Sequence, residues 1–438
     1  MTEGVTPRSS RLRSDGLRRA MLWANINAGV WATGNGLVST TLVFYLAVEL
    51  GAAGIAASCV LAAPRFAGLL RLGVPALMAR LKARKLLCIL SYALSGVILC
   101  TVPLAAAFEG RAPAGIAIAV LVLAWCLYHL AEFCGTVALW SWLGDLMPAR
   151  IRGRLIGRRE AWLTGGRILG LGTSVALASL WKIVLPNAGK WQPLAISASI
   201  GAALMLIAVV PLIFMADPPR SASAVPRTPW RTLWRAFIDP AYRRLLIFNF
   251  WFSVANGITA TAQELYPARV LNVSYEIRQL LQGGLRAGQL VIAPWMGRLV
   301  DAWGNRPVMV VSQAIVATGP LFYLAATPAH RWWIAGAFVV WIAYAGLNVG
   351  LDSIKLKLAP ADNNAPYVAV YHAVGDLANG AMLVAGGVMY DWLTAKGAPA
   401  ESRYFQLFAI GFVGRVLVVP LLVWLIEPGA RRVRDLSI

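Results

Sequence analysis

The chain has 438 residues, of which 59% are hydrophobic and only 13% are charged, and its mean hydropathy is +0.65. An ordinary soluble domain carries about 25% charged residues, so this composition excludes a water-soluble globular protein. The formal net charge of +21 comes from basic residues in the loops, and it therefore requires no nucleic acid as a partner.

Apolar stretches of about 20 residues or more recur along the whole chain, and each is long enough to cross roughly 30 Å of hydrocarbon. We predict an all-α membrane protein with twelve transmembrane helices in two pseudo-symmetric six-helix bundles. Because the number of spans is even, both termini should lie on one side of the membrane. The expected spans are 21–49, 52–78, 86–107, 114–146, 158–184, 192–215, 245–268, 277–300, 307–327, 332–356, 366–392 and 403–426.

Basic residues gather in alternate loops. Short cytoplasmic loops concentrate Lys and Arg, so we predict a multi-pass protein of the cell (inner) membrane with both termini cytoplasmic. The same residues are expected to contact anionic lipid headgroups of the bilayer. They lie in the N-terminal tail and at 80–85, 150–159, 220–244, 298–306 and 431–434.

The composition changes to Pro, Ser and Arg between the sixth and seventh spans. We expect a cytoplasmic linker there, and a short helix from Trp230 to Phe237 at the inner interface of the membrane. No GxxxxGK[ST] motif occurs, so ATP-driven pumping by this chain alone is not expected. The expected organisation is a tail at 1–20, a bundle at 21–215, the linker at 216–244, a second bundle at 245–428 and a tail at 429–438.

The sequence contains a weak internal repeat. Asn35-Gly36 and Tyr45 return as Asn256-Gly257 and Tyr266, each 221 positions later, and Arg65 returns as Arg286 at the same offset. Two similar helical halves are typical of a secondary transporter, in which one half moves against the other around a site near the middle of the bilayer.

The loop after the eighth span runs Gly297-Arg-Leu-Val-Asp-Ala-Trp-Gly-Asn-Arg306. It resembles the cytoplasmic signature of the major facilitator superfamily, Gly-x-Leu-x-Asp-basic-x-Gly-basic, although Ala302 replaces a basic residue and Arg306 comes one position late. The first copy is eroded at 79–85, where neither Gly nor Asp remains.

The run from Gly144-Asp145 through Pro148 to Arg158-Arg159 resembles the loop between the fourth and fifth spans of that family. The resemblance implies a cytoplasmic latch for Asp301 with Arg306, and for Asp145 with Arg152 or Arg154. Ordinary turns with positive-inside arginines are the alternative. The Gly-Pro of the family's antiporter motif is missing from the fifth span.

Ionisable residues inside spans are costly in hydrocarbon and therefore point to a site. His129 and Glu132 are three residues apart and share a helix face, where they are candidates for proton coupling. Glu264 and Asp376 are further candidates. The alternative is that Glu132 only neutralises an arginine, such as Arg65 or Arg167.

Arg65 and Arg286 occupy equivalent positions in the two repeats, and a guanidinium binds carboxylate or phosphate through two parallel hydrogen bonds. These arginines favour an anionic or polyhydroxylated substrate, with internal ion pairs such as Arg286–Glu264 or Arg65–Glu132 as the alternative. Polar companions for substrate binding, or else for helix packing, are Asn35, Asn256, Gln263, Gln289, Asn348 and Asn379.

Asp352 and Lys355 share one face at the inner end of the tenth span and are expected to form a cytoplasmic gate. We find no cofactor motif, no metal-ligand spacing and no catalytic arrangement, so an enzyme is not expected. The sequence predicts a monomeric secondary active transporter, a proton-coupled symporter of a small polar or anionic solute. The alternative is a non-transporting sensor, lipid-handling or assembly protein on the same scaffold.

Overall fold

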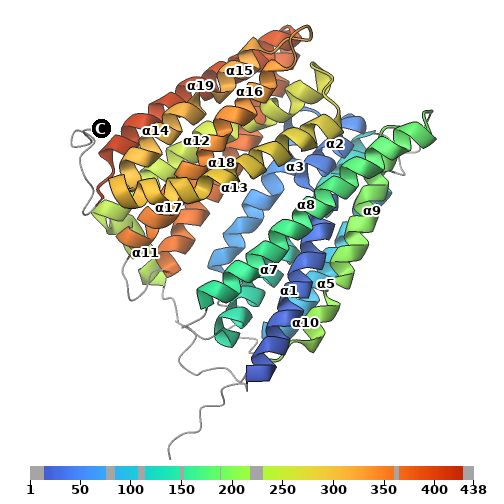
Figure 1. Ribbon diagram of the computed structural model, residues 1–438. Coiled ribbons are helices and arrows are strands. Elements are labelled where there is room, and N and C mark those ends of the chain that lie inside the picture. Colours follow the sequence, from blue (N-terminus) through green and yellow to red (C-terminus); the bar gives the residue numbers. More distant parts are fainter. Residues whose placement is uncertain are drawn as a thin grey trace, which may run out of the picture.

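Every regular element in the described part of the chain is a helix (Figure 1). The structure is a computed structural model, and it describes residues 14–74, 84–106, 114–147, 152–187, 189–217, 230–359 and 365–427. The helices run roughly side by side (Figure 1). Helices suit membrane spans because all of their backbone N–H and C=O groups can form hydrogen bonds within the helix itself, which lipid requires.

The N-terminal half contains several spans that are broken into two consecutive helices. The first crossing is broken at Val38–Ser39, and Ser39 caps the second piece by accepting a hydrogen bond from the N–H of Leu42 at 3.2 Å. The elements are α1 (Ser14–Leu37), α2 (Thr40–Glu49), α3 (Gly54–Ala67), the 3-10 helix η1 (Gly68–Leu72), α5 (Arg84–Leu99), α6 (Thr101–Ala106), α7 (Ala114–Leu146), α8 (Arg152–Val184), α9 (Trp191–Ile207) and α10 (Val210–Phe214).

The C-terminal half repeats this pattern after a short helix, α11, whose Trp234 and Phe237 are exposed. Asp239 caps the next helix by accepting hydrogen bonds from the N–H groups of Ala241 and Tyr242. The elements are α11 (Trp230–Ile238), α12 (Pro240–Arg269), α13 (Tyr275–Trp303), α14 (Asn305–Ala317), α15 (Gly319–Ala325), α16 (Trp333–Val340), η3 (Trp341–Ala343), α17 (Tyr344–Leu358), α18 (Ala365–Ala395) and α19 (Ala400–Trp424).

Nine helical segments of the described chain are long and apolar enough to cross a membrane. The remaining three predicted crossings are α1 with α2, α3 with η1, and α13. Two of them, α1 and α13, are more polar, since they carry buried polar side chains such as Asn25 and Gln279. The third, α3, is shorter, because the α-helix ends at Ala67 and η1 follows. The all-α membrane fold predicted from the sequence is confirmed.

The repeat seen in the sequence returns as repeated packing. Gly36 near the end of α1 lies against α8, where an added Cβ atom would be 2.7 Å from the carbonyl oxygen of Arg167. Gly257 in α12 lies against α18, where an added Cβ atom would be 2.7 Å from the carbonyl oxygen of Asn379. Glycine at both positions allows the backbones of equivalent helix pairs to approach closely.

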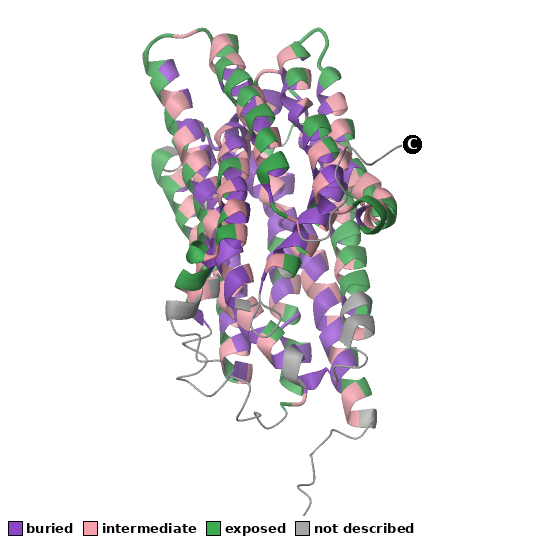
Figure 2. Cartoon of the chain, turned by 90° about the vertical axis from the view of Figure 1, so that its left-hand side faces the viewer, coloured by how far each residue is buried: buried purple, intermediate pink, exposed green. Residues whose placement is uncertain are grey.

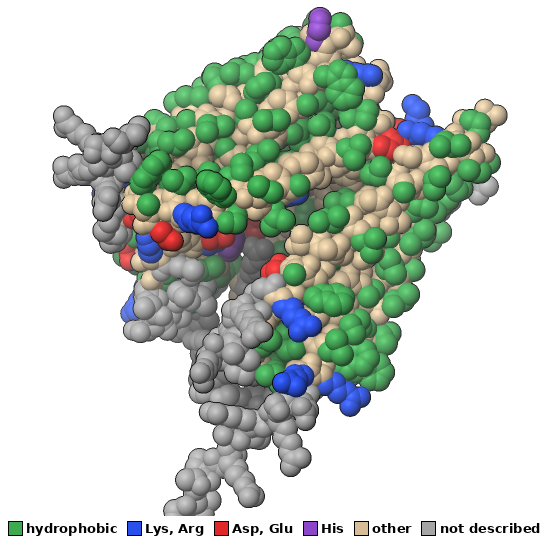
Figure 3. Space-filling view, in the orientation of Figure 1, with side chains coloured by type: hydrophobic (Ala, Val, Ile, Leu, Met, Phe, Trp, Pro, Cys, Tyr) green, Lys and Arg blue, Asp and Glu red, His purple; other side chains and the backbone are tan. Residues whose placement is uncertain are grey.

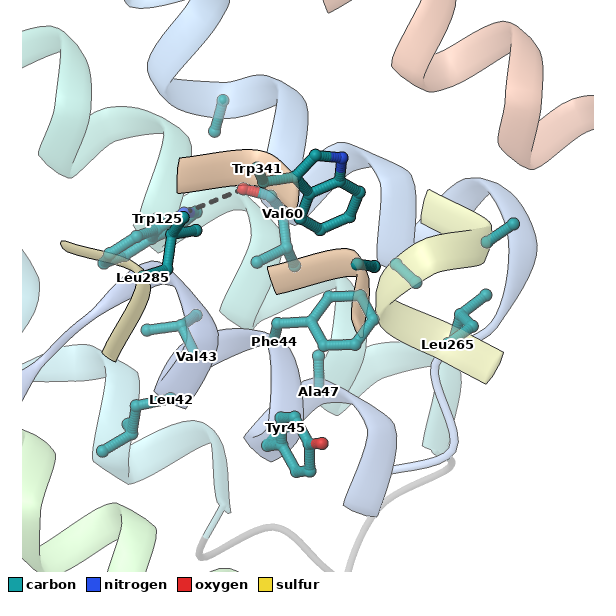
Figure 4. Packing of buried hydrophobic residues seen from close by; sticks show 14 of the residues in the cluster. Leu42, Val43, Phe44, Tyr45, Ala47, Val60, Trp125, Leu265, Leu285 and Trp341 are labelled. Carbon is teal, nitrogen blue, oxygen red and sulfur yellow. Dashed lines mark hydrogen bonds between the residues drawn. The ribbon is translucent and has the colours of Figure 1, made fainter. Parts of the chain in front are cut away.

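Buried residues lie between the helices, and exposed residues lie on their outward faces (Figure 2). Many of the exposed residues are large and apolar, which suits them to contact with lipid. One part of the buried apolar core joins both halves around Phe44, Val60 and Leu265 (Figure 4). Trp125 of α7 packs into it and donates its indole N–H to the carbonyl oxygen of Val60 at 3.0 Å. This hydrogen bond satisfies the only polar group of a fully buried indole.

The two halves contact each other where α3 packs along α18, from Gly54 beside Asp391 to Gly68 beside Asp376. Several polar contacts also join the halves at the end of the molecule away from Ser14 and Glu427, which we call the far end. Lys182 of α8 pairs with Glu276 of α13 at 2.8 Å, and the Ile55 N–H at the start of α3 donates to Asp391 of α18 at 2.9 Å. Further hydrogen bonds across the halves at this end are Tyr45 to the Val273 carbonyl, Arg269 to the Ala52 carbonyl, Gln279 to Ser39, and Ser174 with Tyr275.

Candidate functional site

A cavity of about 530 Å³ lies between the halves, near the middle of the helices. Figure 3 shows the hollow between the α13 side and the α8 side of the molecule. Nearly all of the cavity wall comes from the C-terminal half, and Arg65 of α3 is its contribution from the N-terminal half. The lining residues are Arg65, Asn249, Phe252, Ser253, Asn256, Leu285, Arg286, Gln289, Tyr344, Asn348, Leu351, Asp352, Lys355, Tyr371, His372, Gly375, Asp376 and Asn379.

The two repeat-related arginines, Arg65 and Arg286, both line this cavity, but their surroundings differ. Arg65 lies 3.6 Å from the carboxylate of Asp376, and their side chains are 51% and 15% exposed. No described carboxylate pairs with Arg286, whose guanidinium donates to Gln289 at 3.2 Å. Arg167 of α8 is near enough to interact with Arg286 electrostatically. The side of the cavity near Arg286 is therefore positively charged.

Amide and hydroxyl groups surround these charges. Tyr344 donates to the side-chain oxygen of Asn256 at 2.7 Å, and Asn379 donates to the carbonyl oxygen of Ser253 at 3.2 Å. Gln289 donates to a backbone carbonyl of η3 at 3.2 Å. Asn348 is exposed in the cavity wall and makes no side-chain hydrogen bond with a described residue, so its amide is available to a bound molecule.

A second charged cluster lies at the inner part of the cavity. Asp352 and Lys355 form an ion pair at 2.6 Å on one face of α17, as their spacing of three residues predicts. The ammonium group of Lys355 is also 3.3 Å from His372 of α18 and 5.2 Å from the centre of the Tyr371 ring. The two residues expected to form a gate thus lie in the cavity wall itself.

Three predicted site residues lie elsewhere. Glu264 faces the core of the C-terminal half and pairs with Arg278, whose Nε donates to it at 2.9 Å, so the alternative pairing with Arg286 is wrong. Gln263 is buried, and its side-chain oxygen lies 3.5 Å from Arg415. Asn35 lies near Tyr128 within the N-terminal half and does not line the cavity.

The expected pair of His129 and Glu132 is not formed. Both ring nitrogens of His129 are buried and lack a hydrogen-bond partner among the described residues, because the ring packs on Trp125 with a centroid separation of 4.4 Å. Glu132 instead accepts a hydrogen bond from Thr136 at 2.8 Å. A shared helix face was therefore not sufficient to bring the two side chains together.

The predicted latch residue Asp301 is exposed and forms no ion pair within the described chain. Glu427, just after α19, has the role expected of such a carboxylate. It accepts hydrogen bonds from the N–H groups of Asn305 and Arg306 at 3.0 and 2.9 Å and pairs with Lys357 at 3.1 Å. The side chains of Asp145, Arg152 and Arg154 lie outside the described part of the structure.

The electrostatics of Glu427 follow from these contacts. Burial alone would raise the pKa of its carboxyl, but the N–H groups at the start of α14, the Asn305 side chain and Lys357 lower the pKa below its ordinary value overall. The carboxylate is therefore held in its charged form at the beginning of a helix, where the helix dipole favours negative charge.

Sequence reasoning missed three charged residues that the structure shows to be important: Arg278, Arg415 and Glu427. Arg278 and Arg415 are 1% and 2% exposed. Both fall within predicted spans, and their position inside an apolar stretch was the signal that could have identified them. Glu427 follows the last span directly, and no sequence signal distinguished it from an ordinary polar residue at a helix end.

Part of the chain matches a known protein family. The family model of the Major Facilitator Superfamily matches residues 246–437, which include nearly all of the C-terminal half. No curated protein sequence matches the chain.

Solved structures of transporters share the fold over nearly the whole length. The nucleoside transporter NupG has a TM-score of 0.68 at 15% identity, with 93% of this chain and 100% of that chain covered. The inward-open xylose transporter XylE from E. coli has a TM-score of 0.60 at 14% identity, covering 94% and 99%. A bacterial homologue of the human lysosomal transporter Spinster, inward-facing and occupied, has a TM-score of 0.59 at 17% identity, covering 95% and 96%.

These identities show a common fold and leave the substrate of this chain open. The matched proteins are transporters rather than enzymes, in agreement with the sequence prediction. The C-terminal half of the chain thus matches the Major Facilitator Superfamily model, and the chain as a whole shares the fold of these solved transporters.

Proposed function

We propose that this protein is a secondary active transporter that moves a small anionic solute bearing hydroxyl groups across the cell membrane by alternating access, coupled to protons. The observation that carries this proposal is the cavity between the halves, where Arg286 has no carboxylate partner among the described residues. Its volume of about 530 Å³ suits a small molecule, since ligand pockets commonly measure roughly 300–1,000 Å³.

An anionic group of the solute would bind Arg286, whose guanidinium donates a hydrogen bond to the neutral side chain of Gln289 and has no counter-charge among the described residues. Because an arginine binds a carboxylate or phosphate through charge-assisted hydrogen bonds, this contact would fix both the position and the sign of the substrate. Hydroxyl groups would then bond to the amides that face the cavity, above all Asn348, whose amide makes no bond with a described residue.

Coupling to protons would act through Arg65 and Asp376. In this structure the two side chains lie 3.6 Å apart and compensate each other. A proton on Asp376 would release Arg65 to bind the substrate anion, and loss of that proton would restore the ion pair and expel the anion. The cargo and the proton would thus enter together, which makes the transporter a symporter.

Alternating access requires that the halves separate at one end while they close at the other. Polar contacts join the halves at the far end, beyond the Arg65–Asp376 pair in the cavity wall, and this supports a state that is open toward the opposite end. We place that end in the cytoplasm because short cytoplasmic loops concentrate basic residues, and we place the protein in the inner membrane.

The test is uptake into proteoliposomes that contain the purified full chain. Ligands are first found by thermal-shift screening with organic acids, sugar acids, nucleosides and neutral sugars. For an anionic hit, Arg286→Ala should reduce uptake by about 10- to 100-fold, as the loss of a charge-assisted hydrogen bond of roughly 1.5–3 kcal/mol implies. Arg331→Ala, an exposed arginine at the far end, is the matched control and should leave uptake unchanged. Full uptake by Arg286→Ala would overturn the anion site.

Proton coupling is tested separately with Asp376→Asn. This variant should lose accumulation driven by a pH gradient but retain counterflow exchange of the same solute, because exchange requires no net proton movement. Gradient-driven accumulation by Asp376→Asn would contradict the assigned role of this carboxylate.

A further inference from the structure

Arg415 of α19 is a buried arginine for which the described chain provides no carboxylate partner. It is 2% exposed, and it lies well inside the helix Ala400–Trp424. Its Nη2 lies 3.5 Å from the side-chain oxygen of Gln263, while its Nε and Nη1 have no described acceptor. A guanidinium stays protonated even when it is buried, so its charge must be compensated in some other way.

The neighbouring charges do not provide this compensation. Tyr323 is close enough to interact electrostatically with Arg415, Arg278 and Glu264, so the three charges belong to one cluster. Glu264 is already engaged by Arg278, whose Nε donates to it at 2.9 Å. The pair cancels its own charge, and the cluster keeps one net positive charge in the core of the C-terminal half.

The neutral groups around Arg415 compensate it only in part. The guanidinium carbon lies 5.6 Å from the centre of the Trp341 ring, and the ring face attracts a cation more weakly than a full negative charge does. The side-chain nitrogen of Gln263 is also buried without a described partner. A water molecule could accept hydrogen bonds from these donors, but it would leave the charge unbalanced.

We propose that a small monovalent inorganic anion, with chloride as the probe, binds between Arg415 and Gln263 in the core of the C-terminal half. Such an anion accepts hydrogen bonds from several donors at once and neutralises the cluster. The site lies behind the wall of the central cavity. Trp341, which contacts Arg415 through its ring, accepts a hydrogen bond from the cavity residue Gln289 through its carbonyl oxygen. The anion is therefore a structural component and distinct from the transported solute.

The test compares thermal unfolding of the purified full chain in sodium methanesulfonate, whose bulky anion has no hydroxyl groups, and in sodium chloride at equal ionic strength. Chloride in large excess should raise the Tm by about 3 °C through preferential binding to the folded state. Arg415→Gln should lose this rise. Arg403→Gln changes an arginine of the same helix that bonds to the Ala398 carbonyl and Thr394, and it should retain the rise.

A second variant tests the proposed anion site even if Arg415→Gln fails to fold. Gln263→Glu places a carboxylate where an amide oxygen already faces Arg415, so it supplies an internal counter-charge. This variant should be more stable than the wild type in methanesulfonate and should no longer respond to chloride. The proposal is overturned if the wild type shows no chloride response, if Arg415→Gln retains it, or if Gln263→Glu retains it or is less stable than the wild type in methanesulfonate.

Discussion

Removal of the contact between Asp391 and the start of α3 should favour the conformation in which the far end is open. The carboxylate of Asp391 accepts the N–H of Ile55 at 2.9 Å, and the first N–H groups of a helix have no partner within the helix. Gly54 permits the approach, because it adopts a φ of 44° and because any Cβ atom there would overlap the Asp391 carboxylate. The contact joins α18 of one half to α3 of the other.

The size of the effect follows from the kind of contact. A hydrogen bond to a charged group contributes about 1.5–3 kcal/mol, and negative charge at a helix N-terminus adds about 0.3–1 kcal/mol. Because the contact is exposed and water can replace the lost acceptor, we expect the lower end of this range, about 1.5 kcal/mol, for Asp391→Ala. That energy corresponds to a roughly tenfold increase in the ratio of far-end-open to far-end-closed molecules.

The Lys182–Glu276 ion pair at the same end should contribute less free energy to the far-end-closed conformation. The Lys182 side chain is 58% exposed, and exposed ion pairs typically contribute less than about 1 kcal/mol. Asp391→Asn, which keeps an acceptor oxygen but loses the charge, should produce a shift smaller than that of Asp391→Ala.

The assay measures distances between spin labels at positions 190 and 331, which lie at the far end on opposite halves, in a background without the five native cysteines. Asp391→Ala should increase the population with the longer distance. Lys396→Ala is the matched control, because Lys396 lies near Asp391 and packs over Trp392 without bridging the halves. An unchanged distance distribution in Asp391→Ala, or an equal change in Lys396→Ala, would refute the reasoning.

Two further predictions concern stability. Glu427→Gln should destabilise the fold by about 1–2 kcal/mol at neutral pH. Because the pKa of Glu427 is lowered in the folded protein, its contribution is complete above the ordinary carboxyl pKa and is lost as the pH falls below it, so thermal unfolding of Glu427→Gln should depend less on pH in the acidic range. Glu264→Gln leaves Arg278 buried without a counter-charge and should cost about 3–5 kcal/mol. The double variant Glu264→Gln/Arg278→Met should recover much of this loss of Tm, and no recovery would show that the pair is not the cause.

The sequence predicted the fold well, because lipid imposes a simple rule on it: each crossing needs a long apolar helix. It also predicted that Arg65 and Arg286 are related, and the structure places both in one cavity. The repeat carried this information, since equivalent positions in two similar bundles face the same axis.

The partners of buried side chains were harder to predict. His129 and Glu132 share a helix face, but each side chain contacts a different residue four positions away on α7, Trp125 and Thr136, and spacing alone does not decide between these neighbours. Glu264 near the end of α12 is paired with Arg278 near the start of α13 rather than with Arg286, which lies eight residues further along that helix. Periodicity identifies the buried stripe of a helix, whereas the pairing of charges also depends on the depth at which side chains of neighbouring helices meet.

The eroded signature at 79–85 has a physical explanation in the repeated bundles. In the C-terminal half, Glu427 follows the last helix and binds the start of α14. In the N-terminal half, Asp217 follows α10 and pairs at 3.3 Å with Arg84, the first residue of α5. Each half thus ties the start of its third crossing to the end of its sixth through a carboxylate outside the signature loop. The closing contact of the N-terminal bundle therefore needs no carboxylate in the stretch 79–85, where the sequence has none.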